Sequence, residues 1–377
     1  MKKYNLSNIV LFFLPIICIY QSYLGITAGI LDVVSLFLLF ILIKSLLSNN
    51  LVVDKLAILL FFIVFFALLT MLVFKITQTS WINLFRSNLF ALIIYTYVIN
   101  NRERITINSL KYPLLVINLL NYWVLFTNWS SGFTHHSLES SYFNLNNIGF
   151  ISLLIMLMSI IMVLKEARLS YWNYGNIALS FILVILSFSR SNYLLLAFTV
   201  IFIIIFIFNL KNNVKFLLIG TCLFSLLLPQ IIDSDILSFG FSFLDKKVNV
   251  GTPNEIFLGR LNDIAIHPIE SYLADKPLIY LFFGGKLIPE HSLLITHLTC
   301  FGILSMFIYL QITFNTIKQI THKDASIKLV ALLMLLLFLN DSSTNASTYI
   351  AFVKLIPFAF YGLIVGENNG KYRKVRW

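Results

Sequence analysis

Long apolar runs alternate with short polar segments along most of the chain. A helix needs ~20 predominantly apolar residues to cross the hydrocarbon layer of a bilayer, and the runs have about that length. The pattern therefore predicts an all-α polytopic membrane protein with about twelve transmembrane helices, in which residues 1–377 form a single integral membrane domain. One predicted span, which begins at Ile327, is shorter than the others and contains a charged residue, Lys328. The predicted spans are residues 8–24, 28–47, 56–74, 80–99, 112–127, 147–164, 175–189, 193–209, 216–232, 292–315, 327–340 and 347–365.

The composition agrees with this class of protein. Hydrophobic residues make up 59% of the chain and charged residues 11%, whereas the outer shell of a soluble domain must be polar. The first apolar run follows Lys2 and Lys3, as in a secretory signal, but no small-residue cleavage site follows it and further spans do. We therefore expect an uncleaved first helix.

Lysine and arginine are distributed unevenly between the two sides of the predicted membrane. With the N-terminus inside, the inner segments hold 18 of the 27 basic residues, and the short outer connections hold only Lys75 and Arg190. Cytoplasmic loops are enriched in these residues, so we predict that both termini are cytoplasmic. The net charge of +11 is spread between the spans, which argues against a nucleic-acid partner. The 18 inner residues are Lys2, Lys3, Lys44, Lys55, Arg102, Arg104, Lys111, Lys165, Arg168, Lys211, Lys215, Lys318, Lys323, Lys328, Lys371, Arg373, Lys374 and Arg376.

One outer loop, residues 233–291, is long enough to hold short amphipathic helices. The segment from Thr252 to Glu255 has the residues of a helix start, with a cap, a proline at the first helical position and a glutamate three residues after the cap. Apolar residues then recur at helical spacing, and Arg260 lies on the opposite face. This helix either covers the membrane surface with a solvated polar face or contributes Arg260 to a site.

Two further arginines lie near the outer surface. Arg190 precedes the span that begins at Tyr193, where exposed backbone amides and the helix dipole favour an anion. The alternative is that Arg190 reaches lipid headgroups. Arg86 lies inside a span, a turn or two below the surface, and a charge at that depth usually faces a polar cavity or a partner.

His291 and Glu290 stand where the next inward span begins. A histidine exchanges a proton near neutral pH, so His291 is a candidate general base or substrate orienter, and Glu290 could share that role. A structural role for an interfacial histidine is the alternative. Cys18, Cys222 and Cys300 all fall in apolar runs without the spacing of a metal site, so neither a metal nor another cofactor is expected.

The order of these motifs resembles the bacterial O-antigen polymerase and ligase superfamily, which contains Wzy-type polymerases and WaaL-type ligases. The run Leu186 to Ser191 resembles its Ser-Arg-Gly element, and Gly259-Arg260-Leu261 its second arginine element. Leu281 to Gly285, Glu290 to Leu294, and Gly302 resemble its glycine-rich turn and histidine region. The chain departs from the pattern at Ser191, where glycine is usual, and at Ser292, where asparagine is usual. The match covers residues 140 to 310.

The resemblance implies a metal-independent glycosyltransferase of the bacterial inner membrane, with its site on the periplasmic side. Its donor would be an undecaprenyl-diphosphate-linked oligosaccharide, and a chain-length regulator and a flippase would be partners. Arg190 and Arg260, with Arg86 nearby, would bind the donor diphosphate. His291, with Glu290, would orient or deprotonate the acceptor hydroxyl.

We expect a polymerase that joins O-antigen or capsule repeat units, because polymerases are the more diverse group and the chain matches only at sparse motifs. A ligase that transfers glycan to lipid A-core remains open. From another class, a flippase for lipid-linked oligosaccharides would place its charged residues near the bilayer midplane on broken helices. The candidate residues here gather at the outer surface instead.

Overall fold

All the elements formed by the described residues are helices. The computed structural model describes residues 6–24, 29–48, 50–77, 79–130, 145–165, 170–187, 190–207, 278–285, 293–343 and 351–368. The all-α prediction is confirmed for this part of the chain. In chain order the helices are α1 Leu6–Leu24, α2 Ile30–Leu47, α3 Lys55–Phe74, α4 Thr79–Asn101, η1 Arg102–Arg104, η2 Ile107–Leu110, α5 Lys111–Ser130, α7 Leu145–Lys165, α8 Tyr171–Leu186, α9 Arg190–Phe206, α14 Leu278–Phe283, α15 Leu293–Phe301, α16 Ile303–Ile317, η4 Lys318–Thr321, α17 Ala325–Ser343 and α18 Ala351–Asn368.

Several of these helices have the length and composition of membrane spans. Among the described residues, five are long and apolar enough to cross a bilayer: Ile30–Leu47, Lys55–Phe74, Trp81–Arg104, Ile107–Thr127 and Asn147–Lys165. Five shorter apolar helices accompany them, at Ser7–Ile19, Tyr171–Leu186, Asn192–Phe206, Ala325–Leu339 and Leu355–Val365. The chain is therefore a membrane-embedded helical protein. The total of twelve spans and their orientation remain predictions, and the predicted span 216–232 lies outside the described residues.

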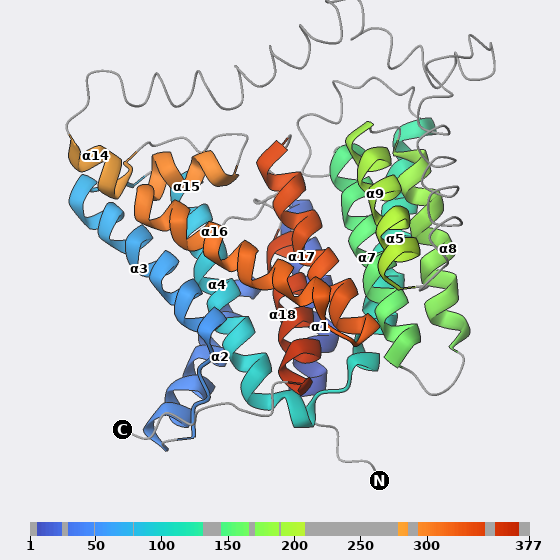
Figure 1. The fold of residues 1–377 in the computed structure, drawn as a ribbon, viewed down its shortest axis with the longest axis horizontal. Helices are drawn as coiled ribbons and strands as arrows, with labels where there is room; N and C mark the ends of the chain where they lie inside the picture. The colour runs from blue at the N-terminus through green and yellow to red at the C-terminus, as the bar shows by residue number, and fades with distance from the viewer. Residues whose placement is uncertain are drawn as a thin grey trace, which may run out of the picture.

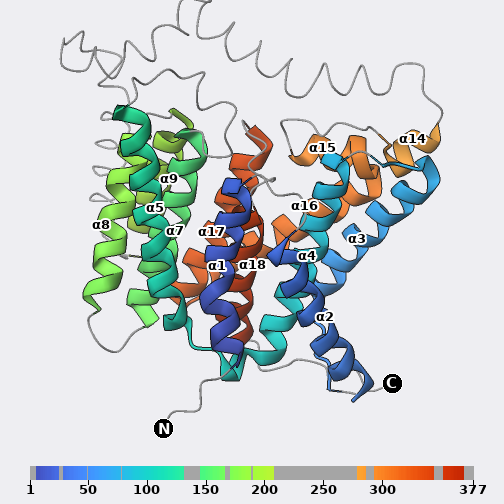
Figure 2. The same cartoon turned by 180° about the vertical axis from the view of Figure 1, so that it is seen from behind.

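The helices form one bundle with two flanks (Figures 1 and 2). Helices α1, α17 and α18 run through the middle, α5, α7, α8 and α9 lie on one flank, and α2, α3, α4, α14, α15 and α16 lie on the other. The core is built mainly from the apolar faces of α1, α4, α7, α17 and α18. Apolar side chains such as Phe40 and Leu72 on the outer helices are exposed, at 67% and 64%. Such a surface is ordinary against lipid and unfavourable in water.

Polar side chains fix several helix ends. Asp54 begins α3 and accepts a hydrogen bond from the Ala57 N–H at 2.8 Å. Asn100 of α4 accepts from the Val52 N–H at 2.7 Å and donates to the Val52 carbonyl at 2.9 Å, which ties the α2–α3 connection to α4. The Lys328 Nζ donates to the Phe206 carbonyl at 3.0 Å, in the last turn of α9. Lys328 lies in the first turn of α17, so its ammonium group reaches the end of a neighbouring helix.

The predicted span 292–315 is not one continuous helix. The chain breaks at Gly302, which separates α15 from α16. Figure 1 shows α14 and α15 lying across one end of the bundle while α16 descends beside α3. Of the predicted long loop, α14 belongs to the described part, and residues 233–277 and 286–291 lie outside it.

Candidate functional site

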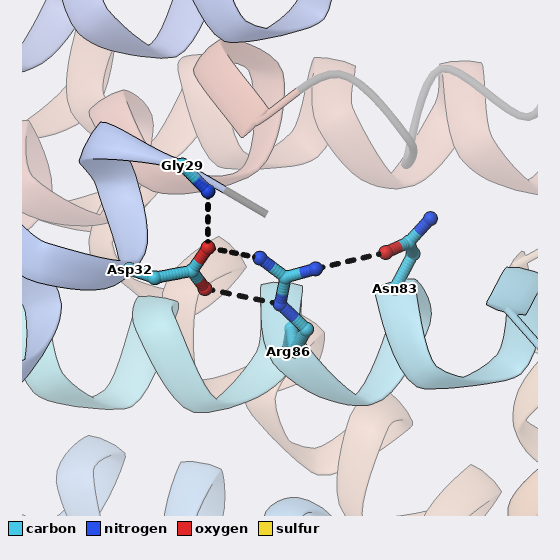
Figure 3. A network of polar contacts seen from close by, with 4 residues as sticks. All are labelled: Gly29, Asp32, Asn83 and Arg86. Carbon is cyan, nitrogen blue, oxygen red and sulfur yellow. Dashed lines mark hydrogen bonds and ion pairs between the residues drawn. The ribbon is translucent and has the colours of Figure 1, made fainter. Parts of the chain in front are cut away.

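Arg86 of α4 forms an ion pair with Asp32 in the first turn of α2 (Figure 3). The Arg86 Nε donates to Asp32 Oδ1 at 3.1 Å, and Nη2 donates to Oδ2. The third nitrogen, Nη1, donates to Asn83 Oδ1 at 3.2 Å. Asp32 Oδ2 also accepts from the backbone N–H of Gly29 at 2.7 Å. This two-point pairing is the geometry that an arginine fork gives with a carboxylate.

The ion pair explains how a charge is tolerated inside a predicted span. The side chains of Arg86 and Asp32 are only 20% and 27% exposed, and mutual neutralisation lowers the cost of burying both charges. The partner expected for Arg86 is thus an acidic residue that was not among the predicted site residues. Its signal was Asp32 itself, a carboxylate at the start of an apolar run. An anion that bound Arg86 would have to share or displace Asp32.

The corner between α8 and α9 places Arg190 at the first residue of a helix. Helix α8 ends at Leu186, and α9 begins at Arg190, three residues before the predicted start at Tyr193. The side chain of Arg190 is outside the described set. The Tyr193 hydroxyl donates to the Ile185 carbonyl at 2.6 Å, and Asn192 Nδ2 donates to Ser187 Oγ at 3.3 Å. These bonds tie the first turn of α9 back to the end of α8.

Helix α7 packs closely against this corner through Gly149. A Cβ atom at Gly149 would lie 2.1 Å from Asn192 Nδ2 and 2.4 Å from Ser187 Oγ. Only a residue without a side chain allows this approach. The N-terminal part of α7 therefore supports the turn that carries Arg190.

Three glycines form a second corner, where α14, α15 and α16 meet. Gly284, Gly285 and Gly302 have φ angles of 74°, 106° and 86°, which side chains disfavour. The Gly285 N–H donates to the Cys300 carbonyl at 3.2 Å. A Cβ at Gly302 would lie 1.9 Å from the Phe282 carbonyl oxygen, and one at Gly284 would lie 2.3 Å from the Cys300 carbonyl carbon. The turn at Gly284 and Gly285 is thus in backbone contact with the helix break at Gly302.

Helices α3 and α4 hold this glycine junction in place. The Thr70 hydroxyl of α3 donates to the Phe283 carbonyl, and the ring of Phe74 packs on Tyr280 with centroids 4.7 Å apart. From α4, Trp81 meets Phe301 edge to face at 5.3 Å. The junction is therefore fixed from two sides, and it holds the end of α15 where the chain turns into α16.

His297 lies just beyond the junction and was not selected from the sequence. It is 1% exposed, and its Nδ1 is 2.9 Å from the Ser305 Oγ across the helix break. Its ring stacks on Tyr309 with centroids 4.6 Å apart. The histidine thereby joins α15 to α16 through a polar and an aromatic contact. In the sequence, the only sign of this role is that His297 is a titratable residue within an apolar run.

The remaining predicted site residues, Arg260, Glu290 and His291, lie outside the described residues. Within the part of the chain that the structure describes, no group of three His, Cys, Asp or Glu residues is placed to hold a metal ion. Comparison with protein-family models, with curated proteins and with solved structures found no match to this chain. The fold and the partly buried ion pair define a helical membrane protein with two tightly packed corners at one end of its bundle.

Proposed function

We propose that the protein is a membrane glycosyltransferase that joins repeat units carried on undecaprenyl diphosphate. The observation that supports this most directly is the placement of the two corners. The start of α9, with Arg190, and the start of α15, two residues after His291 in the sequence, lie at the same end of the bundle (Figures 1 and 2). A lipid-linked donor reaches such a site from the membrane while its glycan extends into the aqueous phase.

In this proposal the arginines replace a metal ion. Arg190 and Arg260 bind the donor diphosphate, and Arg86 joins them when the diphosphate shares or displaces Asp32. His291, assisted by Glu290, takes the proton of the acceptor hydroxyl, whose oxygen attacks the anomeric carbon of the donor. The bond from that carbon to the diphosphate oxygen breaks, and undecaprenyl diphosphate leaves as the anion. Preorganised guanidinium groups stabilise charge that develops on the leaving oxygen.

The proposed setting is the inner membrane of a bacterium, with the site facing the periplasm. A flippase would deliver the donor, and a chain-length regulator would limit the product. Transfer to lipid A-core by a ligase is the alternative within the same chemistry.

A transporter of lipid-linked oligosaccharide is a second candidate, and one observation favours it. The break at Gly302, beside the buried His297, gives the bundle an interrupted helix, as in transporter sites, but at one end of the bundle and not at its middle. Glycosyl transfer and lipid transport are distinguished by their products, which are longer glycans in one case and relocated lipid in the other.

The purified protein in liposomes would be incubated with polyprenyl-diphosphate-linked oligosaccharide and the products resolved on a gel. We expect a ladder of lengthening lipid-linked glycans, reduced at least about a hundredfold in rate by Arg190→Ala, Arg260→Ala or His291→Ala. Lys75→Gln, which removes an outer cation outside the proposed site, serves as the matched control and should keep the ladder. A single transfer that requires lipid A-core would make the protein a ligase. Movement of the lipid between leaflets without any transfer would make it a transporter.

A further inference from the structure

A cavity opens at the end of the bundle opposite the two corners. It has a volume of about 500 Å³ and lies where η1, η2, the end of α7 and the end of α18 meet. Its charged lining residues are Arg102, Glu103 and Lys165. The volume falls in the range of ~300–1,000 Å³ that is typical of small-ligand sites.

The lining is divided between charged and aliphatic side chains. Ile105, Ile107, Leu363 and Ile364 supply the apolar part, and Leu363 and Ile364 are only 8% and 2% exposed. A ligand that satisfies the whole lining must therefore carry both charge and hydrocarbon. A phospholipid has this composition where its headgroup meets its acyl chains.

Lys165 is held in place by a second acidic group. Its Nζ lies 3.4 Å from Asp324 Oδ2, and Asp324 Oδ1 accepts from the Ser326 N–H at 2.8 Å at the start of α17. Partial burial opposes ionisation of Asp324, but this backbone hydrogen bond and the Lys165 charge outweigh it and hold the pKa of the carboxyl below its ordinary value. The ionised Asp324 fixes the Lys165 ammonium at the cavity wall, which lowers the entropic cost of binding there.

We propose that this cavity binds the headgroup of a zwitterionic aminophospholipid of the phosphatidylethanolamine type. Arg102 and Lys165 bind the phosphate, Glu103 binds the ammonium group, and the aliphatic wall receives the first acyl carbons. A purely anionic headgroup fits less well, since Glu103 and the C-terminal dipole of α7 oppose added negative charge. The basic residues at this end predict that it faces the cytoplasm, where inner-leaflet lipids lie.

A second cavity at the same end provides an internal comparison. It measures about 440 Å³ and is lined by Lys318, Gln319, Thr321, His322 and Lys323. Among the described residues, this lining is cationic and contains neither a carboxylate nor an aliphatic wall. It therefore controls for attraction of lipid by positive charge alone.

The test is native mass spectrometry of the full-length protein in detergent, titrated with short-chain phosphatidylethanolamine, short-chain phosphatidylglycerol or inorganic phosphate. We expect one retained phosphatidylethanolamine per chain, bound more tightly than phosphatidylglycerol, and no retained phosphate. Equal retention of both lipids, or retention of inorganic phosphate as tight as that of lipid, would overturn the proposal.

Variants locate the binding site within the molecule. Arg102→Gln should weaken phosphatidylethanolamine binding about tenfold, since a charge-assisted hydrogen bond is lost. Glu103→Gln should remove the preference over phosphatidylglycerol, and Leu363→Trp should block the lipid by filling the aliphatic wall. Lys323→Gln, in the second cavity, should leave binding unchanged. Lipid retention that is unaffected by all three cavity variants in correctly folded protein would refute the site, whatever the result of the glycosyl-transfer assay.

Discussion

Several polar side chains inside the bundle are stabilised by specific partners on neighbouring helices. Arg86 pairs with Asp32 across α4 and α2. Between α5 and α8, the Asn118 Nδ2 donates to Ser180 Oγ at 2.9 Å, and the Tyr122 hydroxyl donates to the Leu179 carbonyl at 3.1 Å. Because unsatisfied polar groups are costly away from water, such pairs also specify which helices lie side by side.

A charge exchange tests whether the Arg86–Asp32 pair connects α2 to α4. We expect Asp32→Arg and Arg86→Asp to lower the stability by about 1–3 kcal/mol each, because each leaves two like charges in contact in a largely buried setting. The double variant Asp32→Arg/Arg86→Asp should be more stable than either single variant in thermal unfolding in detergent. Lys75→Gln, which changes a charge outside this pair, is the control for loss of a charge alone. A double variant that loses the sum of both effects would show that the two residues do not depend on each other.

At the scale of elements, close backbone approach decides how the helices meet. Gly149 lets α7 reach the α8–α9 corner, and Gly302 lets the α15–α16 break receive the end of α14. Small residues allow such approaches in membrane bundles, where van der Waals packing holds helices together. The corners that support the proposed site are therefore products of packing between helices distant in sequence.

Gly302 and Gly175 are a matched pair for testing this. Gly302→Ala puts a Cβ 1.9 Å from the Phe282 oxygen, at a φ of 86°, so we expect a loss of more than about 2 kcal/mol. A Cβ at Gly175, inside α8, would meet nothing within 4 Å. Gly175→Ala should therefore raise the stability by about 0.5–1 kcal/mol. Thermal unfolding in detergent measures both changes. Equal effects of the two substitutions would contradict the close backbone approach at Gly302.

At the scale of the whole molecule, long-range contacts collect the basic residues at one end. Lys55 Nζ of α3 bonds to Asn315 Oδ1 of α16 at 3.4 Å, Lys165 of α7 to Asp324, and Lys328 of α17 to the end of α9. Arg102, after α4, shares a cavity with Lys165 and the end of α18. The glycine junction and the Arg190 corner lie at the other end. This polarity is the basis for expecting the basic end in the cytoplasm.

Labelling of introduced cysteines with a membrane-impermeant maleimide tests that orientation. The background would carry Cys222→Ser, since Cys18 and Cys300 are buried. Lys75→Cys should be labelled from the outer side of the inner membrane. Thr321→Cys, at the basic end, should be labelled only after that membrane is opened. The reverse pattern would invert the predicted topology and place the proposed site in the cytoplasm.

The positions of most helices followed directly from the sequence. The ranges 56–74 and 147–164 agree closely with α3 and α7, because membrane burial is read from the apolar length of each segment alone. The structure differs from the prediction where the apolar pattern of a segment favours one continuous helix but packing against another helix requires a break. Residues 292–315 form an uninterrupted apolar pattern, yet Gly302 breaks the helix to accommodate α14.

The sequence by itself determined the class of protein and the positions of most of the described helices. Only the tertiary structure decided that Asp32 is the partner of Arg86, that the end of α14 packs against the break at Gly302, and that His297 joins α15 to α16. The physical reason is the distance along the sequence over which each feature is determined. Apolar length is a property of a single segment measured against a bilayer of constant thickness, whereas Asp32 and Arg86 are 54 residues apart and meet only because α2 packs on α4.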